Sequence, residues 1–143
     1  MLRDKAKECI ESELKYGDPY NEYHYNCAET MLNAANDYYE LNLSNKTLNM
    51  ILPFGSGRVQ GVCGMLTGGA SVLGVIFTED KPSYNDKVKE ITDAWVNEFM
   101  EEFKYIDCKV IKSTNGLTED EPCTYLIFRA CDMLEGIIDK YRD

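Results

Sequence analysis

The sequence contains few basic residues and only one histidine. Its 143 residues carry 15 Lys and Arg against 25 Asp and Glu, which gives a formal net charge of −10. Because phosphate binding needs clustered Lys and Arg, and no basic run is present, we exclude nucleic acid and anionic membranes as partners. The chain is long and apolar enough, at 44% apolar residues, to bury a core as one domain of residues 1–143.

Several motifs that define common sites are also missing. The sequence has no CxxCH for covalent haem, no HExxH for zinc hydrolysis, no Walker lysine and no local CxxC pair. Residues 55–61 resemble a dinucleotide-binding loop, but the third glycine comes one residue late and no strand pattern precedes it. We therefore exclude a Rossmann-type nucleotide site.

The sequence lacks long apolar runs of the kind that target or span membranes. Residues 1–8 contain no apolar stretch that could act as a signal peptide, so we expect a cytoplasmic protein. Residues 59–78 carry no charge, but five glycines lower the apolar content of this segment. We therefore expect it to be buried within the protein and not inserted into a membrane. In a reducing compartment, the six cysteines are more often catalytic, metal-binding or buried than paired in disulfides.

Strand signals are almost absent, and apolar residues recur at helical spacing throughout the chain. The clearest stripe runs from Val88 through Trp95 to Phe103, with Glu and Lys on the opposite face. We predict an all-α, single-domain bundle of five to six helices, with a glycine-rich loop leading into a buried central helix. Gly64 and Gly68 would give that helix a small-residue face that another helix or a cofactor could approach closely.

Two cysteines are predicted at the start of a helix by strong local signals. Asn26 is a good N-cap and Glu29 completes a capping box, which places Cys27 in a first turn. Pro122 favours the first helical position and places Cys123 in a first turn as well. A helix N-terminus stabilises thiolate over thiol, so we expect both cysteines to have a lowered pKa.

Two more cysteines occupy similar positions. Cys63 lies where the glycine-rich loop enters the central helix, and Cys108 follows Asp107, a weaker N-cap candidate for a short turn. Cys27, Cys63 and Cys123 each head the apolar stripe of their own helix. If those helices begin at the same end of the bundle, the thiols meet at one partly buried site.

The remaining candidates have simpler explanations beside the functional ones. Cys9 and Cys131 fall in the middle of apolar stripes and are predicted to be small core residues. Buried packing is also open for the other four cysteines, because cysteine is among the most buried residue types. His24 could assist ionisation of Cys27 or act as a ligand, or be a polar turn residue. Arg58 could bind an anion or neutralise a thiolate cluster, or be a solvated loop residue.

The pattern of cysteines and glycines resembles a known family. Asn26-Cys27-Ala28-Glu29, then Cys63-Gly64-Met65-Leu66-Thr67-Gly68-Gly69, then isolated Cys108 and Cys123 resemble the C_GCAxxG_C_C family of redox-active proteins. The resemblance covers roughly Tyr25 to the C-terminus, with Met65 where the family usually has Ala. It implies a small helical protein whose four shared cysteines match Cys27, Cys63, Cys108 and Cys123. Similar domains occur in split-Soret cytochromes, where an iron–sulfur role is suspected, although the haem-attachment motif is missing here.

Three functions from different classes remain open at this point. The leading hypothesis is an iron–sulfur cluster or other thiolate-bound metal for electron transfer to a redox partner protein, with Cys27, Cys63, Cys108 and Cys123 as ligands. The cofactor would be bordered by Gly61, Gly64, Gly68 and Arg58. The second is metal-free thiol–disulfide chemistry, with Cys27 and Cys63 as the reactive thiols. The third is a helical interaction module with inert cysteines, such as a homodimer packed through the small-residue face.

Overall fold

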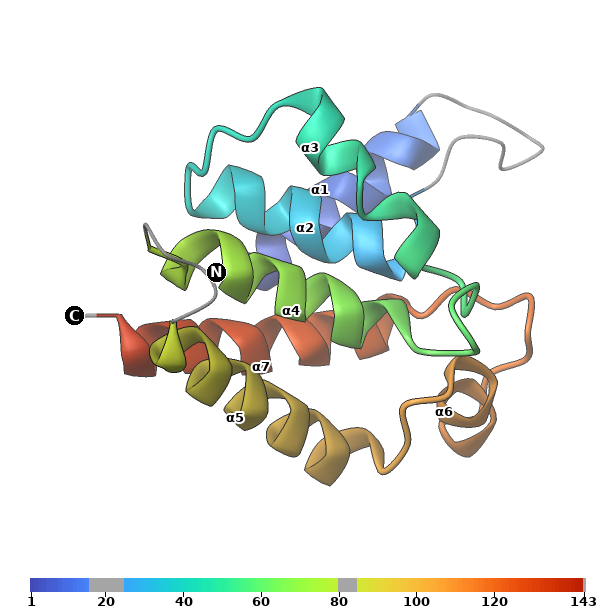
Figure 1. The fold of residues 1–143 in the computed structure, drawn as a ribbon. Coiled ribbons are helices and arrows are strands. Elements are labelled where there is room, and N and C mark those ends of the chain that lie inside the picture. The colour runs from blue at the N-terminus through green and yellow to red at the C-terminus, as the bar shows by residue number, and fades with distance from the viewer. Residues whose placement is uncertain (16–24, 80–84, 143) are drawn as a thin grey trace.

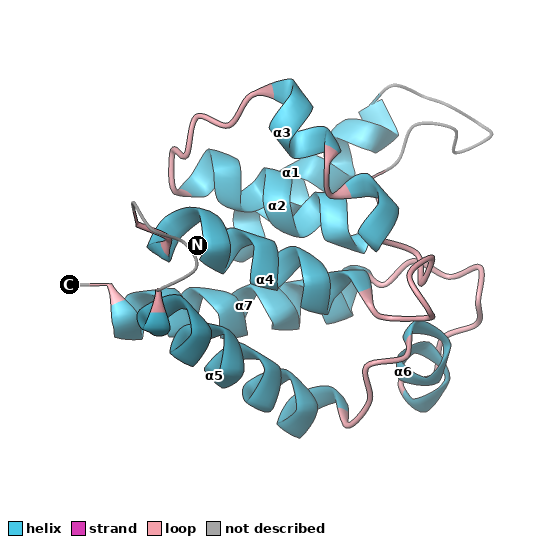
Figure 2. Cartoon of the chain, in the orientation of Figure 1, coloured by secondary structure: helices cyan, strands magenta, loops and turns pink. Residues whose placement is uncertain are grey.

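The computed structural model describes residues 1–15, 25–79 and 85–142, and helices make up most of this part of the chain (Figure 1; Figure 2). In chain order the elements are α1 (Leu2–Lys15), α2 (Cys27–Tyr38), α3 (Asn45–Asn49), the 3-10 turn η1 (Leu52–Phe54), α4 (Gly64–Phe77), α5 (Asp86–Phe103), α6 (Cys108–Thr114) and α7 (Thr124–Tyr141). The all-α prediction is confirmed. The predicted number of helices was too low, because the short helices α3 and α6 form behind the side-chain N-caps Ser44 and Asp107.

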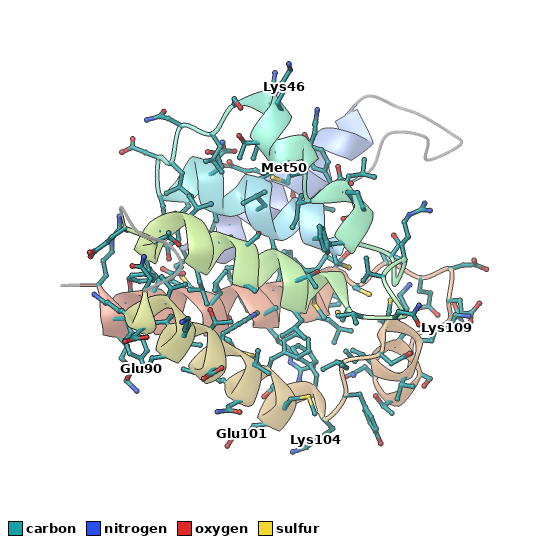
Figure 3. All side chains as sticks on the ribbon, viewed as in Figure 1. Lys46, Met50, Glu90, Glu101, Lys104 and Lys109 are labelled. Atoms are coloured by element: carbon teal, nitrogen blue, oxygen red, sulfur yellow. The ribbon has the colours of Figure 1, made fainter. Side chains whose placement is uncertain are left out.

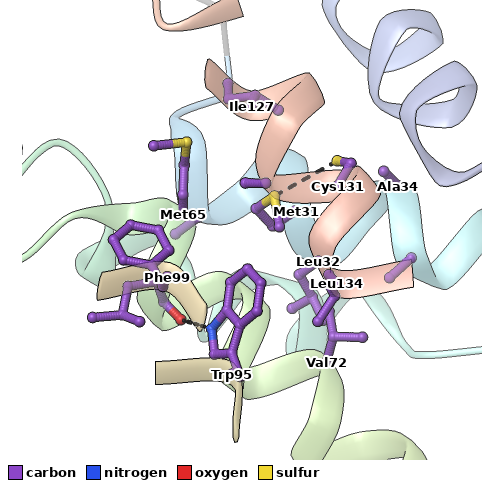
Figure 4. Close-up of a cluster of buried hydrophobic side chains, with 14 of the residues drawn as sticks. Met31, Leu32, Ala34, Met65, Val72, Trp95, Phe99, Ile127, Cys131 and Leu134 are labelled. Carbon is purple, nitrogen blue, oxygen red and sulfur yellow. Dashed lines mark hydrogen bonds between the residues drawn. The ribbon is translucent and has the colours of Figure 1, made fainter. Parts of the chain in front are cut away.

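Helix α4 lies in the middle of the bundle, packed against α2, α5 and α7 (Figure 1). The predicted apolar stripe of α5 is confirmed, since Trp95, Phe99 and Phe103 are all buried against this core. The Trp95 indole N–H donates to the Leu66 carbonyl of α4 at 3.0 Å, which satisfies the one polar group of that ring (Figure 4). Helix α4 is therefore packed between α2 on one side and α5 and α7 on the other, in agreement with the burial that its apolar composition predicts.

The small-residue face of α4 packs directly on α2. A Cβ added to Gly64 would lie 2.8 Å from the Ala28 amide nitrogen, and one added to Gly68 would lie 2.8 Å from the Ala28 carbonyl oxygen. Real Cβ atoms essentially never approach backbone this closely, so only glycine allows the two helix backbones to pack at this distance. A helix therefore occupies this face of Gly64 and Gly68.

Four helices begin at one end of the bundle. The first residues of α2, α4, α6 and α7 all lie at the right in Figure 1, where the loops containing residues 55–63 and 115–123 also meet. This arrangement meets the condition on which convergence of the thiols depended. Within the described ranges, no helix is long and apolar enough to cross a membrane.

Candidate functional site

Cys27 is the first residue of α2, as the capping pattern predicted. The Asn26 side chain accepts a hydrogen bond from the Glu29 N–H at 2.9 Å, and the Glu29 carboxylate accepts from the Asn26 N–H at 3.1 Å. The Asn26 amide also donates to the Leu52 carbonyl at 2.9 Å, which ties η1 to the start of α2. These bonds fix the half-buried Cys27 at the end of the bundle where the helices begin.

Replacing Asn26 with alanine should lower the free energy of unfolding by about 1–2 kcal/mol, because the cap of α2 and the bond to Leu52 are both lost. Urea unfolding at constant pH measures the change. Asn26→Ser is the matched control, since serine keeps a side-chain acceptor for the Glu29 N–H and loses the amide that donates to Leu52 without adding a charge. We expect it to lose less than half as much stability. Equal stability of Asn26→Ala and the unmodified protein would contradict this role of Asn26.

Cys63 and Cys123 each lie one residue before their helix. Cys63 is the N-cap of α4, because its backbone is extended while its carbonyl accepts from the Thr67 N–H at 3.3 Å. Its own N–H donates to the Ile106 carbonyl at 2.7 Å. Cys123 is the N-cap of α7, two positions earlier than Pro122 predicted, and its carbonyl accepts from the Ile127 N–H at 2.8 Å. Both side chains are nearly buried, with exposed fractions of 3% and 8%.

Cys108 is the first residue of α6, behind Asp107, whose side chain accepts from the Val110 N–H at 3.1 Å. The Cys108 N–H donates to the Gly61 carbonyl at 2.7 Å. Together with the bond from Cys63 to Ile106, this pairs the glycine-rich loop with the segment before α6. We call this pair of backbone bonds the loop clamp. It fixes the starts of α4 and α6 relative to each other.

Glycines allow this loop to lie flat against α6. Gly57 has a φ of 69°, and a Cβ built on it would lie 3.2 Å from the Cys108 Cβ. Gly61 has a φ of 80°, and a Cβ there would lie 2.6 Å from a carboxylate oxygen of Asp107. Both positions combine a left-handed backbone with close approach, which explains why the loop is rich in glycine.

The four thiols gather into one cluster, which we call the four-cysteine site: Cys27, Cys63, Cys108 and Cys123. Every one of the six pairs among them interacts electrostatically, and the Cys27 thiol donates a hydrogen bond to the Cys123 sulfur. The four cysteines are 36, 45 and 15 residues apart in the sequence, and the tertiary fold brings them together. No two of the six cysteines form a disulfide.

Cys9 and Cys131 lie elsewhere, in the core between α1 and α7. Both are buried, and they interact with each other electrostatically. The Cys131 thiol donates to the Met31 sulfur at 3.7 Å (Figure 4). The fold therefore divides the six cysteines into the same two groups that the helix positions indicated.

The pKa values within the four-cysteine site diverge. The hydrogen bond from Cys27 lowers the pKa of Cys123 to about 7, burial opposes this, and the positive charge of Lys112 adds to the lowering. The pKa of Cys27 is raised well above its ordinary value, first by its bond to Cys123 and then by burial. One proton is therefore lost readily from this pair and the second is retained, as expected for two strongly coupled groups.

Burial controls the other two thiols. It raises the pKa of Cys63 to about 12, although the backbone N–H groups of Met65 and Leu66 in the first turn of α4 act in the opposite direction. Burial also raises the pKa of Cys108, against the charges of Lys112 and Lys109. The expectation that a helix start lowers the pKa of its thiol was wrong for Cys27, which is raised by its hydrogen bond to Cys123 and by burial. It also fails for Cys63 and Cys108, because desolvation outweighs the helix terminus.

Lys112 is a residue of this site that the sequence reasoning missed. It lies four positions after Cys108 on α6, so the two side chains project from the same face of the helix. That spacing was the available signal. Arg58 is exposed on the glycine-rich loop, and His24 lies outside the described residues.

The four thiols are suitable metal ligands by their chemistry, but their side chains are not arranged around a metal position. Four soft sulfur donors suit iron, zinc or an iron–sulfur cluster. Within the part of the chain that the structure describes, however, no three His, Cys, Asp or Glu side chains are placed as ligands of a metal ion. The site fits a metal by the type of its donors, and the side chains would have to reorient to bind one.

The fold and site together define an all-α protein with a cluster of four cysteines at one end of its bundle. A family model described as "Putative redox-active protein (C_GCAxxG_C_C)" matches residues 25–137. The chain belongs to the C_GCAxxG_C_C family. No curated protein and no solved structure matches the chain.

Proposed function

We propose that this protein carries out dithiol–disulfide exchange through Cys27 and Cys123. The observation that carries the proposal is the hydrogen bond from the Cys27 thiol to the Cys123 sulfur. It places the two thiols next to each other, and it lowers the pKa of Cys123 to about 7. A thiolate beside a second thiol is the arrangement that disulfide exchange requires.

The reaction would proceed in two displacements. The Cys123 thiolate attacks one sulfur of a disulfide on a redox partner protein, forming a mixed disulfide and releasing one partner thiolate, which takes up a proton. Cys27 then loses its proton and attacks the Cys123 sulfur, which releases the second partner thiol. In total, two protein thiols become one disulfide and the partner disulfide becomes two thiols, so electrons and protons balance.

This assignment replaces Cys63 by Cys123 as the partner of Cys27. The pKa of Cys63 is raised to about 12, so this thiol stays protonated at neutral pH. A protonated thiol is a poor nucleophile. A reducing compartment such as the cytoplasm would keep the pair in its dithiol form between turnovers.

An iron–sulfur cluster held by Cys27, Cys63, Cys108 and Cys123 is the second candidate, favoured by the interaction of all six pairs of thiols. When bound, such a cluster supplies one-electron transfer. The starts of α2, α4, α6 and α7 would offset part of the negative charge of four thiolates. Gly61 and the exposed Arg58 lie on the loop that borders this site.

The test is oxidation of anaerobically purified protein with a small-molecule disulfide, followed by counting of free thiols and peptide mapping. We expect a loss of two thiols, recovered as one peptide that contains Cys27 linked to Cys123. Cys123→Ser should abolish this loss, whereas Cys131→Ala, in the separate core pair, should leave it unchanged. Iron and visible absorption that disappear in Cys63→Ser and Cys108→Ser variants would instead support the cluster. Protein with neither behaviour would refute both candidates.

A further inference from the structure

Lys112 joins α6 to the loop that leads into Cys123. Its ammonium group donates to the carbonyl of Glu119 at 2.9 Å and to that of Glu121 at 2.7 Å. Its own carbonyl accepts from the Leu117 N–H at 2.9 Å. The side chain is partly buried, and the two bonds hold the ammonium against the loop just before Cys123.

The hydrogen bonds of Lys112 do not neutralise its charge. Both acceptors are backbone carbonyls, which are neutral, and so these bonds position the charge without cancelling it. Lys109, on the same helix, differs because its ammonium lies 3.6 Å from the Glu119 carboxylate and both side chains are highly exposed. The Lys112 charge favours the thiolate form of both Cys108 and Cys123, whereas that of Lys109 acts on Cys108.

We propose that Lys112 is a positioning residue that sets the reduction potential of the four-cysteine site. The reduced site carries a thiolate, and the disulfide does not, so a fixed positive charge beside it stabilises the reduced state and raises the potential. The same sign applies to a cluster, because reduction adds a negative charge there too. This inference rests on the proposed function, since it requires that the site undergo reduction and oxidation.

The experiment measures the fraction of oxidised protein in dithiothreitol redox buffers at pH 9, where a thiol with a pKa of about 7 is fully ionised and the reduced site carries its thiolate. For Lys112→Met we expect the equilibrium constant for reduction to fall about tenfold, which for a two-electron couple is about 30 mV more negative. Lys112→Arg keeps the charge and should stay within about twofold of the unmodified protein. Lys109→Met is the matched control, with the same charge change on the same helix, and should shift the constant by less than half as much on a logarithmic scale.

Lys112→Gln separates the charge from the anchoring of the loop, because its amide still offers donors to the carbonyls but has no charge. We expect its potential to fall as in Lys112→Met even if the loop stays anchored. An unchanged potential in Lys112→Gln and Lys112→Met would overturn the inference, as would an equal shift in Lys109→Met. Failure of the proposed function is a different result, in which the unmodified protein loses no thiols in any buffer.

Discussion

Raising the pH through neutrality is expected to ionise one thiol of the folded protein with a pKa of about 7, whereas the ordinary pKa of a cysteine thiol is 9.0. The ultraviolet absorption of the thiolate reports this step without requiring that a reagent reach the nearly buried Cys123. The pKa is lowered, so the thiolate is present above pH 7 and is lost as the pH falls below it. The signal should be absent in Cys123→Ser.

Cys27→Ala should largely remove this neutral-pH thiolate. Without the thiol donor, burial acts on Cys123 with only Lys112 opposing it. If the pKa returns to its ordinary value, the thiolate fraction at pH 7 falls from about one half to about one in a hundred, two pKa units being two factors of ten. Cys27→Ser keeps an O–H donor and should retain most of the signal. A midpoint near 9 in the unmodified protein would contradict the pairing of Cys27 with Cys123.

Replacing Gly68 with alanine should lower the free energy of unfolding by about 2 kcal/mol, the second large effect. The new methyl group would lie 2.8 Å from the Ala28 carbonyl oxygen and 2.9 Å from the Met31 Cβ. Helix α2 must therefore move away from α4, and overpacking of this kind typically costs about 1–3 kcal/mol. The better helix propensity of alanine returns up to about 1 kcal/mol, so we place the overpacking cost at the upper end.

The same helix provides the control for this substitution. A Cβ on Gly74 would meet nothing within 4 Å, so Gly74→Ala should gain up to about 1 kcal/mol from helix propensity alone. Urea unfolding of both variants gives the comparison. Since α2 begins at Cys27, its displacement in Gly68→Ala should also weaken the contact of Cys27 with Cys123 and raise the midpoint of thiolate formation. Equal stabilities of Gly68→Ala and Gly74→Ala would disprove the close packing of α2 on α4.

The starts of the helices were largely predictable from the sequence, because local chemistry decides them. The capping box of Asn26 and Glu29 and the cap at Asp107 each act within one turn, and both place their cysteines as expected. Cys123 was placed two residues too far into its helix. Local signals therefore predict the position of a residue relative to a helix start to within about two residues.

The contacts that complete the site were not predictable in this way. The loop clamp joins the Cys63 N–H to Ile106 and the Cys108 N–H to Gly61, pairs that are more than 40 residues apart in the sequence. The pairing of Cys27 with Cys123 likewise depends on how α2 and α7 pack. Burial of the thiols follows from this packing, which is why the direction of the pKa shift could not be obtained from helix position alone.

The contact between Cys27 and Cys123 also links the redox state of the protein to its folding stability. The two residues are 96 positions apart, so a disulfide between them would close most of the chain into one loop. Closing a loop of that size removes conformational freedom from the unfolded chain and stabilises the folded state by about 4–5 kcal/mol in the chain-entropy description. Reduction of this disulfide would remove that stabilisation. The protein would therefore be less stable to unfolding with two thiols than with the disulfide, and folding would in turn favour formation of the disulfide.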